Sequence, residues 1–204
     1  MLPLPYFFTT NQLTEMKSET EQKHCDMVAH LCKAGQDIAD EQTAFKSRIW
    51  SASALICIYA SNLLDTVKKV VAYNKPVNKE DVEAYLVELQ DEIAGFPTER
   101  INDGEFDPLN HKEAHLLHMA TGIAGESGEI LDNIVQALAS KKIDRENLVE
   151  ELGDLEFYME GIRSCIGIAR EEVLEYNYHK LMKKRYPNGY SNEAALARAD
   201  KEVS

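Results

Sequence analysis

The sequence predicts an all-α protein, and three observations lead to this prediction. Apolar residues recur at helical spacing through most of the 204 residues. No segment shows the sustained alternation of apolar and polar residues that is typical of a strand. Turn signals such as Asn74-Lys75-Pro76 and Gly95-Phe96-Pro97 divide the helical pattern into segments. We therefore expect a bundle of helices connected by turns.

The predicted helices cover most of the chain. They span residues 11–40, 43–73, 78–95, 110–139, 144–167 and 168–185, and a short helix follows Ser191. Asn78, Asp144 and Ser191 are suited to cap the helices that they precede. The polar segment 98–109 is the expected linker. The chain would then divide into an N-terminal region, 1–97, and a second region, 110–204, unless both pack as one compact bundle.

Composition excludes some classes of partner. The net charge of −13 argues against a nucleic-acid surface, which needs a clustered basic stripe. No apolar run is long enough to span a bilayer, and the first ten residues do not resemble a signal peptide. The cysteines form no CxxC pair, so we expect buried, reduced thiols and a cytoplasmic protein: Cys25, Cys32, Cys57 and Cys165.

Two acidic pairs form the main candidate site. Glu126 and Glu129 lie three residues apart on one predicted helix, and Glu151 and Asp154 do so on the next. Residues three apart share a helix face, so each pair projects two carboxylates to one side. Four gathered carboxylates repel one another unless they are protonated or bind a cation, and carboxylate oxygens suit Mg²⁺. The alternative is that these charges are simply solvated.

Glycines interrupt both acidic turns. Gly125, Gly128 and Gly153 each cost about 1 kcal/mol relative to Ala in a helix interior. We therefore predict that another helix or a ligand comes close to the backbone at these positions.

The sequence also contains a faint internal repeat. The aligned segments are 74–82 with 140–148, 62–65 with 129–132, and 88–91 with 151–154. The first copy has Tyr59 and Asn62 where the second has Glu126 and Glu129, so it lacks half of the carboxylates. We expect a degenerate first copy and a chemically competent second copy. Chance similarity between acidic, amphipathic helices is the alternative.

The acidic turns resemble a family signature. Glu126-x-x-Glu129, 21 intervening residues and Glu151-x-x-Asp154 match the all-α nucleoside triphosphate pyrophosphohydrolases, the group of MazG, the dimeric dUTPases and phosphoribosyl-ATP pyrophosphohydrolase. Residues 115–201, about two-fifths of the chain, resemble the MazG-like enzymes of bacteriophages and bacteria. Residues 27–38 resemble the segment that directly precedes the catalytic helices in such proteins, although here the degenerate copy lies between them.

The resemblance implies a reaction and a metal. The expected activity is hydrolysis of a nucleoside triphosphate between the α and β phosphates, with Mg²⁺, or Mn²⁺ in its place. Glu129, Glu151 and Asp154 would hold the metal, and Glu126 would either share in this or orient and deprotonate the attacking water. The resemblance further implies a homodimer or larger assembly in the cytoplasm of a bacterium or a phage-infected host.

Basic residues follow the acidic turns. The family pattern has an Asn and a Lys at the places of Asn177 and Lys180, where they contact metal-bound phosphates. Arg185 is a candidate phosphate clamp, and Tyr158 and Tyr186 are candidates for stacking on a base. Basic residues near a helix C-terminus are also favoured by the helix dipole without any ligand.

Three alternative functions remain open. His111, His115 and His118 share a helical face, which is a weak indication of Zn²⁺ binding. A di-iron bundle would need Glu-x-x-His pairs, and the chain has Glu-x-x-Glu and Glu-x-x-Asp instead. A non-catalytic regulator whose acidic helices dock a basic partner is the main alternative to an enzyme. The sequence predicts neither the base nor the sugar of a substrate.

Overall fold

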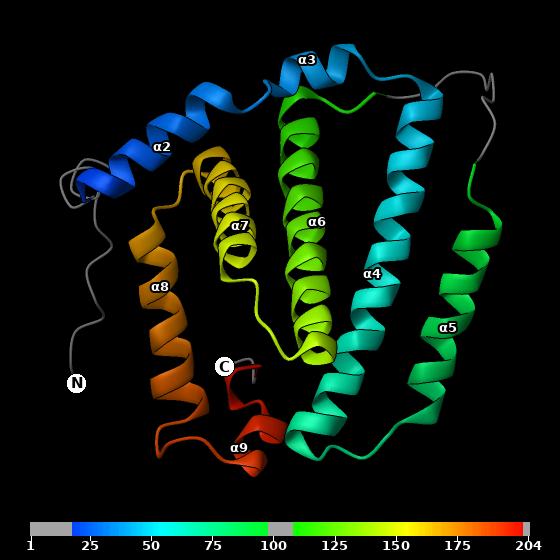
Figure 1. The fold of residues 1–204 in the computed structure, drawn as a ribbon, viewed down its shortest axis with the longest axis vertical. Coiled ribbons are helices and arrows are strands. Elements are labelled where there is room, and N and C mark those ends of the chain that lie inside the picture. Colours follow the sequence, from blue (N-terminus) through cyan, green and yellow to red (C-terminus); the bar gives the residue numbers. More distant parts are fainter. Residues whose placement is uncertain (1–17, 98–107, 202–204) are drawn as a thin grey trace. The chain divides into compact units, whose positions relative to one another are not determined.

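The computed structural model describes residues 18–97 and 108–201, and these residues form helices without any strand (Figure 1). The all-α prediction is confirmed. The α-helices are α2 (Glu19–Leu31), α3 (Gly35–Asp40), α4 (Ala44–Tyr73), α5 (Lys79–Ala94), α6 (His111–Ser140), α7 (Arg145–Ile166), α8 (Arg170–His179) and α9 (Asn192–Ala197). A π-helical segment, Lys180–Arg185, continues α8, and a short 3₁₀ turn, Ala199–Lys201, follows α9.

The predicted capping residues act as caps. The side chain of Asn78 accepts a hydrogen bond from the Glu80 amide at the start of α5. Asp144 accepts from the Asn147 amide at the start of α7, and Ser191 caps α9 in the same way. These side chains satisfy backbone amides that have no partner within the helix, which explains why local sequence places the helix starts well.

The helix predicted over 11–40 is wrong in one respect. Its part before Ser18 lies outside the described residues, and the rest is broken between α2 and α3. Cys32 takes an extended conformation at the end of α2. Gly35 then lies so close to the carbonyl of His111, at the start of α6, that a Cβ atom at Gly35 would overlap it. The break therefore depends on a contact distant in sequence. The linker predicted over 98–109 falls largely on residues 98–107, which are outside the described part.

The chain forms two compact units, which we describe separately. The first unit comprises residues 1–37 and 111–170. Within it, α6 and α7 form a helical hairpin, and α2 packs against α7 (Figure 1). Met119 is fully buried and lies against Gly161, where a Cβ atom would overlap the methionine side chain. We call α2 together with residues 32–37 the leader segment. It contacts the acidic helices, although residues 38–110 separate it from them in sequence.

The second unit comprises residues 38–110 and 171–204. Its longest helices, α4 and α5, form a second hairpin, and neither contains a buried residue. α9 packs against α4, and the π-helical segment contacts the final 3₁₀ turn. In that contact, Arg185 donates a hydrogen bond to the Ala195 carbonyl at 3.0 Å and pairs with Asp200.

Two further expectations concern membranes and thiols. Within the described residues, every helix is either too short or too polar to cross a bilayer. The four cysteines are free, as expected, but each is partly exposed rather than buried.

Candidate metal centre

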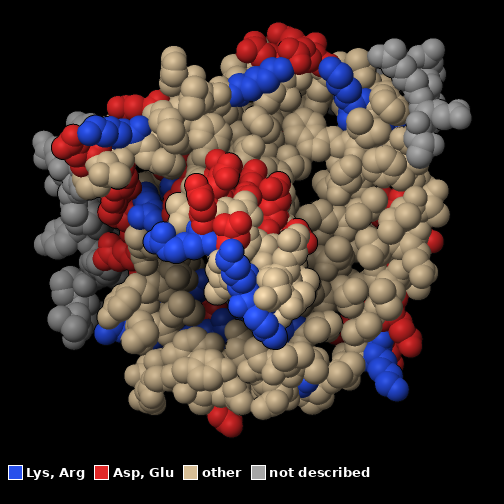
Figure 2. All heavy atoms as spheres, in the orientation of Figure 1, with Lys and Arg blue, Asp and Glu red and all other residues tan. Residues whose placement is uncertain are grey.

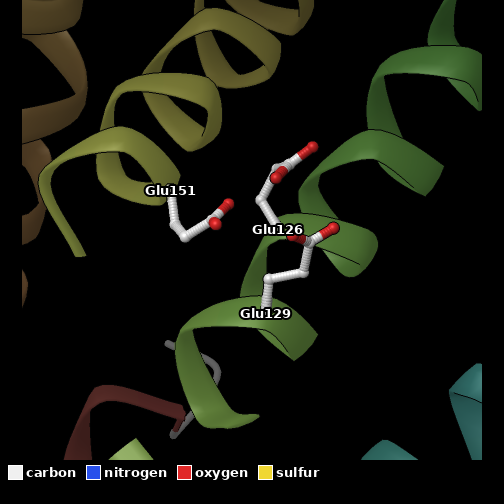
Figure 3. Close-up of side chains that lie close together, drawn as sticks. All are labelled: Glu126, Glu129 and Glu151. Atoms are coloured by element: carbon white, nitrogen blue, oxygen red, sulfur yellow. The ribbon is translucent and has the colours of Figure 1, made fainter. Parts of the chain in front are cut away.

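Three predicted acidic residues converge between α6 and α7. Glu126 and Glu129 extend from α6 and Glu151 from α7, with their carboxylates in the space between the helices (Figure 3). One oxygen from each lies within 4.8 Å of the others. In the part of the chain that the structure describes, this is the only group of three or more His, Cys, Asp or Glu side chains placed to share a metal ion.

Two glycines hold the hairpin close enough for this convergence. The Tyr158 ring of α7 lies against the α6 backbone at Gly122, where a Cβ atom would overlap the ring. One turn further along, Met119 lies against Gly161 in the same way. The acidic turn of α6 comes just after Gly122, and that of α7 comes just before Tyr158. Because the helices touch at Gly122 and Gly161, the two acidic turns face each other.

Of the four predicted acidic residues, Asp154 is the one that does not converge with the others. It is exposed and lies outside the group of three carboxylates. Its charge nevertheless acts on the group, because it contributes to raising the pKa of Glu126 and of Tyr158. Asp154 is therefore near the centre, at its exposed edge.

The surroundings of Glu126 raise the pKa of its carboxyl group. Partial burial raises its pKa, and the negative charges of Glu129, Asp154 and Glu151 raise it further. A hydrogen bond with the Glu151 side chain acts in the same direction. Without a cation, this cluster therefore favours a proton on Glu126, and a divalent cation would relieve the same repulsion.

Glu151 is held by a chain of amides that sequence reasoning missed. Glu151 is only 6% exposed, and its Oε1 accepts a hydrogen bond of 2.6 Å from Asn147 Nδ2. Asn147 Oδ1 in turn accepts one from Asn133 Nδ2. Both asparagines lie four residues from an acidic residue, Asn133 after Glu129 and Asn147 before Glu151, and so share its helix face. Two poor helix formers at such positions were a signal that could have been used.

A pocket of about 430 Å³ adjoins the carboxylates. Glu129, Glu151, Asn133 and Asn147 all contribute to its lining. The other lining residues are mostly small or polar and come from α6 and from its connection to α7: Gly125, Gly128, Asp132, Gln136, Ala137, Ser140, Lys142 and Asp144. The pocket can therefore hold a polar group next to an ion bound by the carboxylates.

The prediction that helices approach at the glycines of the acidic turns is wrong. A Cβ atom at Gly125, Gly128 or Gly153 would meet no described atom within 4 Å. Gly125 and Gly128 instead form part of the pocket wall. The close approaches occur at Gly122 and Gly161, because helix contacts depend on which residues lie opposite on the partner helix.

The row of histidines does not gather around a common point. His115 Nε2 donates to the Gly161 carbonyl at 3.2 Å, and its Nδ1 lies 3.8 Å from the Cys32 thiol. His118 contacts the edge of Tyr158, and burial lowers its pKa, with smaller contributions from His115 and Lys33. His115 thus joins the hairpin to Cys32, and His118 packs within the hairpin, which agrees with a structural role.

The predicted substrate-binding residues all belong to the second unit. Asn177 is exposed on α8, and Lys180 begins the π-helical segment. The guanidinium of Arg185 contacts Ala195 and Asp200 and lies 5.4 Å from the centre of the Tyr186 ring. These residues therefore belong to a different unit from the three carboxylates, and Arg185 has local partners that the sequence did not reveal.

The surroundings of the centre are acidic. On the face shown in Figure 2, Asp and Glu side chains gather over α6 and α7, and Lys and Arg side chains lie directly below them in this view. Comparisons with protein-family models, with curated proteins and with solved structures found no match to the chain. The following proposal therefore depends on the chemistry of the residues and on the sequence resemblance.

Proposed function

We propose that the protein is a Mg²⁺-dependent nucleoside triphosphate pyrophosphohydrolase of the MazG-like type, which releases a nucleoside monophosphate and pyrophosphate. The observation that carries the proposal is the convergence of Glu126, Glu129 and Glu151 between two helices, beside a pocket. The family signature selects this reaction among the chemistries open to a carboxylate cluster. The all-α architecture is compatible with it.

The donor set fits a hard divalent cation. Oxygen ligands without histidine or thiolate suit Mg²⁺ or Mn²⁺ better than Zn²⁺, and Mg²⁺ commonly uses a few carboxylates together with substrate phosphates. In the proposal, Glu129, Glu151 and Asp154 hold the ion. When bound, the ion would neutralise phosphate charge and orient the reacting groups.

Glu126 is the proposed base. It lies among the other carboxylates, and burial together with their charges raises its pKa, which makes the carboxylate a stronger base. Its role would be to orient the attacking water and take one proton from it. Asn177, Lys180 and Arg185 would contact the phosphates, and Tyr186 the base. Arg185 would have to leave Asp200 to do so.

Pyrophosphate release tests the proposal directly. The protein is incubated with Mg²⁺ and each common ribo- and deoxyribonucleoside triphosphate, with modified nucleotides and guanosine alarmones added to the panel. We expect release from at least one substrate and its loss in Glu129→Ala. Glu150→Ala is the matched control, because Glu150 is an exposed neighbour of Glu151 on another side of α7. No release from any nucleotide, or full activity in Glu129→Ala, would contradict the proposal.

The proposal includes self-association. Several large apolar side chains of α6 and α7 are exposed: Leu131, Ile134, Val135, Leu138, Val149 and Leu152. Such a set is more apolar than an ordinary helical surface and is suited to burial against a second copy. Light scattering on the purified protein in the assay buffer is expected to give the mass of a homodimer or a larger assembly.

An acidic binding module is the second candidate. The gathering of Asp and Glu side chains over α6 and α7 (Figure 2) and the net charge of −13 favour it. Calorimetry separates the two functions. Nucleotide binding that requires Mg²⁺ and Asp154 supports the enzyme, whereas salt-sensitive binding of a basic polypeptide without nucleotide supports the module. Stoichiometric iron in the purified protein would favour a di-iron centre over both.

A further inference from the structure

The amides beside Glu151 form a directed chain. A carboxylate can only accept hydrogen bonds, so the amide group of Asn147 must turn its Nδ2 towards Glu151. Its Oδ1 then faces Asn133, which must turn its own Nδ2 towards it. The orientation of each amide therefore follows from the charge of Glu151.

The outer end of this chain is an acceptor without a partner. Asn133 is 8% exposed, and its Oδ1 makes no hydrogen bond to any described residue. Asn133 also lines the pocket beside the carboxylates. Buried polar atoms in folded proteins almost always have a hydrogen-bonding partner, so an acceptor left free beside a pocket indicates a ligand with an N–H or O–H group.

The chain lies at the junction of the carboxylates and the pocket. Glu129 and Glu151 belong to both, and Asn133 and Asn147 line the pocket, whereas Glu126 does not. A nucleotide whose phosphates meet an ion at the carboxylates can extend its remaining part into this space. The amides would then contact the carboxylate at one end and the nucleotide at the other.

We propose that Asn147 and Asn133 are positioning residues that hold the Glu151 carboxylate in its metal-binding orientation, and that Asn133 Oδ1 accepts a hydrogen bond from the nucleotide in the adjoining pocket. The inference rests on the proposed function, and it adds two residues and one contact to it. Residues that orient a metal ligand in this way typically change metal affinity by 10- to 100-fold when they are removed.

Metal binding without turnover is the first test. Mn²⁺ binding is measured by calorimetry and by the loss of the free-ion electron paramagnetic resonance signal. We expect Asn147→Ala to bind Mn²⁺ about 10- to 100-fold more weakly than the wild type. Asn62→Ala is the matched control, because Asn62 is an exposed asparagine on α4 of the other hairpin. Circular dichroism must show that each variant is folded, and unchanged Mn²⁺ affinity in a folded Asn147→Ala would overturn the proposal.

Non-additivity separates positioning from general stabilisation. If Asn133 acts on Glu151 only through Asn147, Asn133→Ala weakens Mn²⁺ binding in the wild type but has no further effect in Asn147→Ala. Asn147→Gln, which keeps the same donor and acceptor, should recover part of the affinity. Independent, additive losses of Mn²⁺ affinity from the two alanine substitutions would show that Asn133 does not act on Glu151 through Asn147.

The acceptor is tested with a non-hydrolysable probe. At saturating Mn²⁺, α,β-imido deoxynucleoside triphosphates should bind Asn133→Ala at least 5-fold more weakly than Asn147→Ala, because only the former lacks the Oδ1 acceptor. Equal affinities would show that Asn133 Oδ1 binds only water.

The tests distinguish this inference from the proposed function. Wild-type Mn²⁺ binding that weakens in Asn147→Ala, together with no hydrolysis of any nucleotide, would leave the positioning role standing and remove the proposed reaction. Hydrolysis with unchanged metal affinity in Asn147→Ala would do the opposite.

Discussion

The two helical hairpins, α4–α5 and α6–α7, share a framework and differ in chemistry. The first helix of each has 30 residues. A residue with positive φ follows it in both hairpins, Asn74 at 52° and Lys141 at 59°. The second helix of each is capped by residues that the sequence repeat aligns, Asn78 and Asp144.

The difference lies where the helices of each hairpin face each other. In α6–α7, Glu126 meets Glu151, and burial together with the surrounding carboxylates raises the pKa of Glu126. In α4–α5, Tyr59 occupies the aligned position and meets Glu88, whose charge raises the pKa of the phenol, with smaller contributions from burial, Glu92 and a hydrogen bond to Glu88. A phenol and a carboxylate satisfy each other, whereas carboxylates require a proton or a cation. The residues at the aligned positions, Tyr59 and Asn62 in one hairpin and Glu126 and Glu129 in the other, therefore account for the difference in charge between the two hairpins.

The largest expected difference is in activity. If the proposed function is right, Glu151→Gln should lower pyrophosphate release by about 10³-fold or more, since it removes a buried, proposed metal ligand and metal ions supply several kcal/mol of transition-state stabilisation. The aligned substitution Glu88→Gln should leave the rate within about twofold. Steady-state kinetics with Mg²⁺ measures both, and a similar loss in the two variants would contradict the assignment of the site to α6–α7.

The next difference concerns ion pairs. Glu160 on α7 is 4% exposed and accepts hydrogen bonds from Arg163, Cys25 and Ser164. Glu160→Ala leaves the buried Arg163 with the more distant Glu156, at 3.6 Å, as its ion-pair partner and should destabilise the protein by about 3 kcal/mol. Asp65→Ala on α4 removes an exposed partner of two lysines and should cost at most about 0.5 kcal/mol. Denaturant unfolding measures both free energies.

The pH dependence of that difference has a definite sign. Burial alone would raise the pKa of Glu160, but its hydrogen bonds with Cys25, Arg163 and Ser164 and the charge of Arg163 lower it overall. The pKa of Asp65 is lowered to about 2, first by hydrogen bonds from Lys68 and Lys69. Both carboxylates therefore stabilise the fold above the unfolded pKa of about 4 and lose this contribution as the pH falls further. The gap between wild type and Glu160→Ala should shrink below pH 4.

A smaller difference lies within α6 itself. Gly122→Ala would force a methyl group into the Tyr158 ring and should destabilise the protein by about 1–3 kcal/mol. Gly128→Ala faces open space and should stabilise the metal-free protein by up to about 1 kcal/mol through helix propensity. Thermal unfolding in chelator measures both. Equal effects would indicate that the contact at Gly122 does not hold the hairpin together.

The smallest expected effect comes from a double substitution that gives the α4–α5 hairpin the carboxylates of α6–α7. Tyr59→Glu with Asn62→Glu places two carboxylates opposite Glu88 and Asp91, as in α6–α7. We expect one additional, weak Mn²⁺-binding event in calorimetry. Tyr59→Phe with Asn62→Ala is the control and should add none. Absence of the new event in a folded protein would show that the aligned positions do not face each other as they do in α6–α7.

Local sequence was sufficient for the helices and for the acidic residues. The starts of α5, α7 and α9 follow from Asn78, Asp144 and Ser191, because a capping side chain acts within three residues of itself. Spacing also placed Glu126 and Glu129 on one face, because helix periodicity requires it.

Contacts between helices were not predictable in the same way. The break before Gly35 depends on His111, and the importance of Gly122 depends on Tyr158. Neither partner is evident from one sequence, since it depends on register between helices. The hydrogen bonds of Asn133 and Asn147 likewise depend on which side chains α6 and α7 place opposite each other.

The contact between the leader and α7 has a consequence for synthesis. Cys25 meets Glu160 across 135 residues, so the leader leaves the ribosome long before its partner exists. Closing so long a loop costs only slightly more free energy than closing a short one, but contacts this distant in sequence form slowly. Until α7 has been translated, the Cys25 thiol lacks its hydrogen bond to Glu160, and the first unit is completed only after the whole α4–α5 hairpin has emerged.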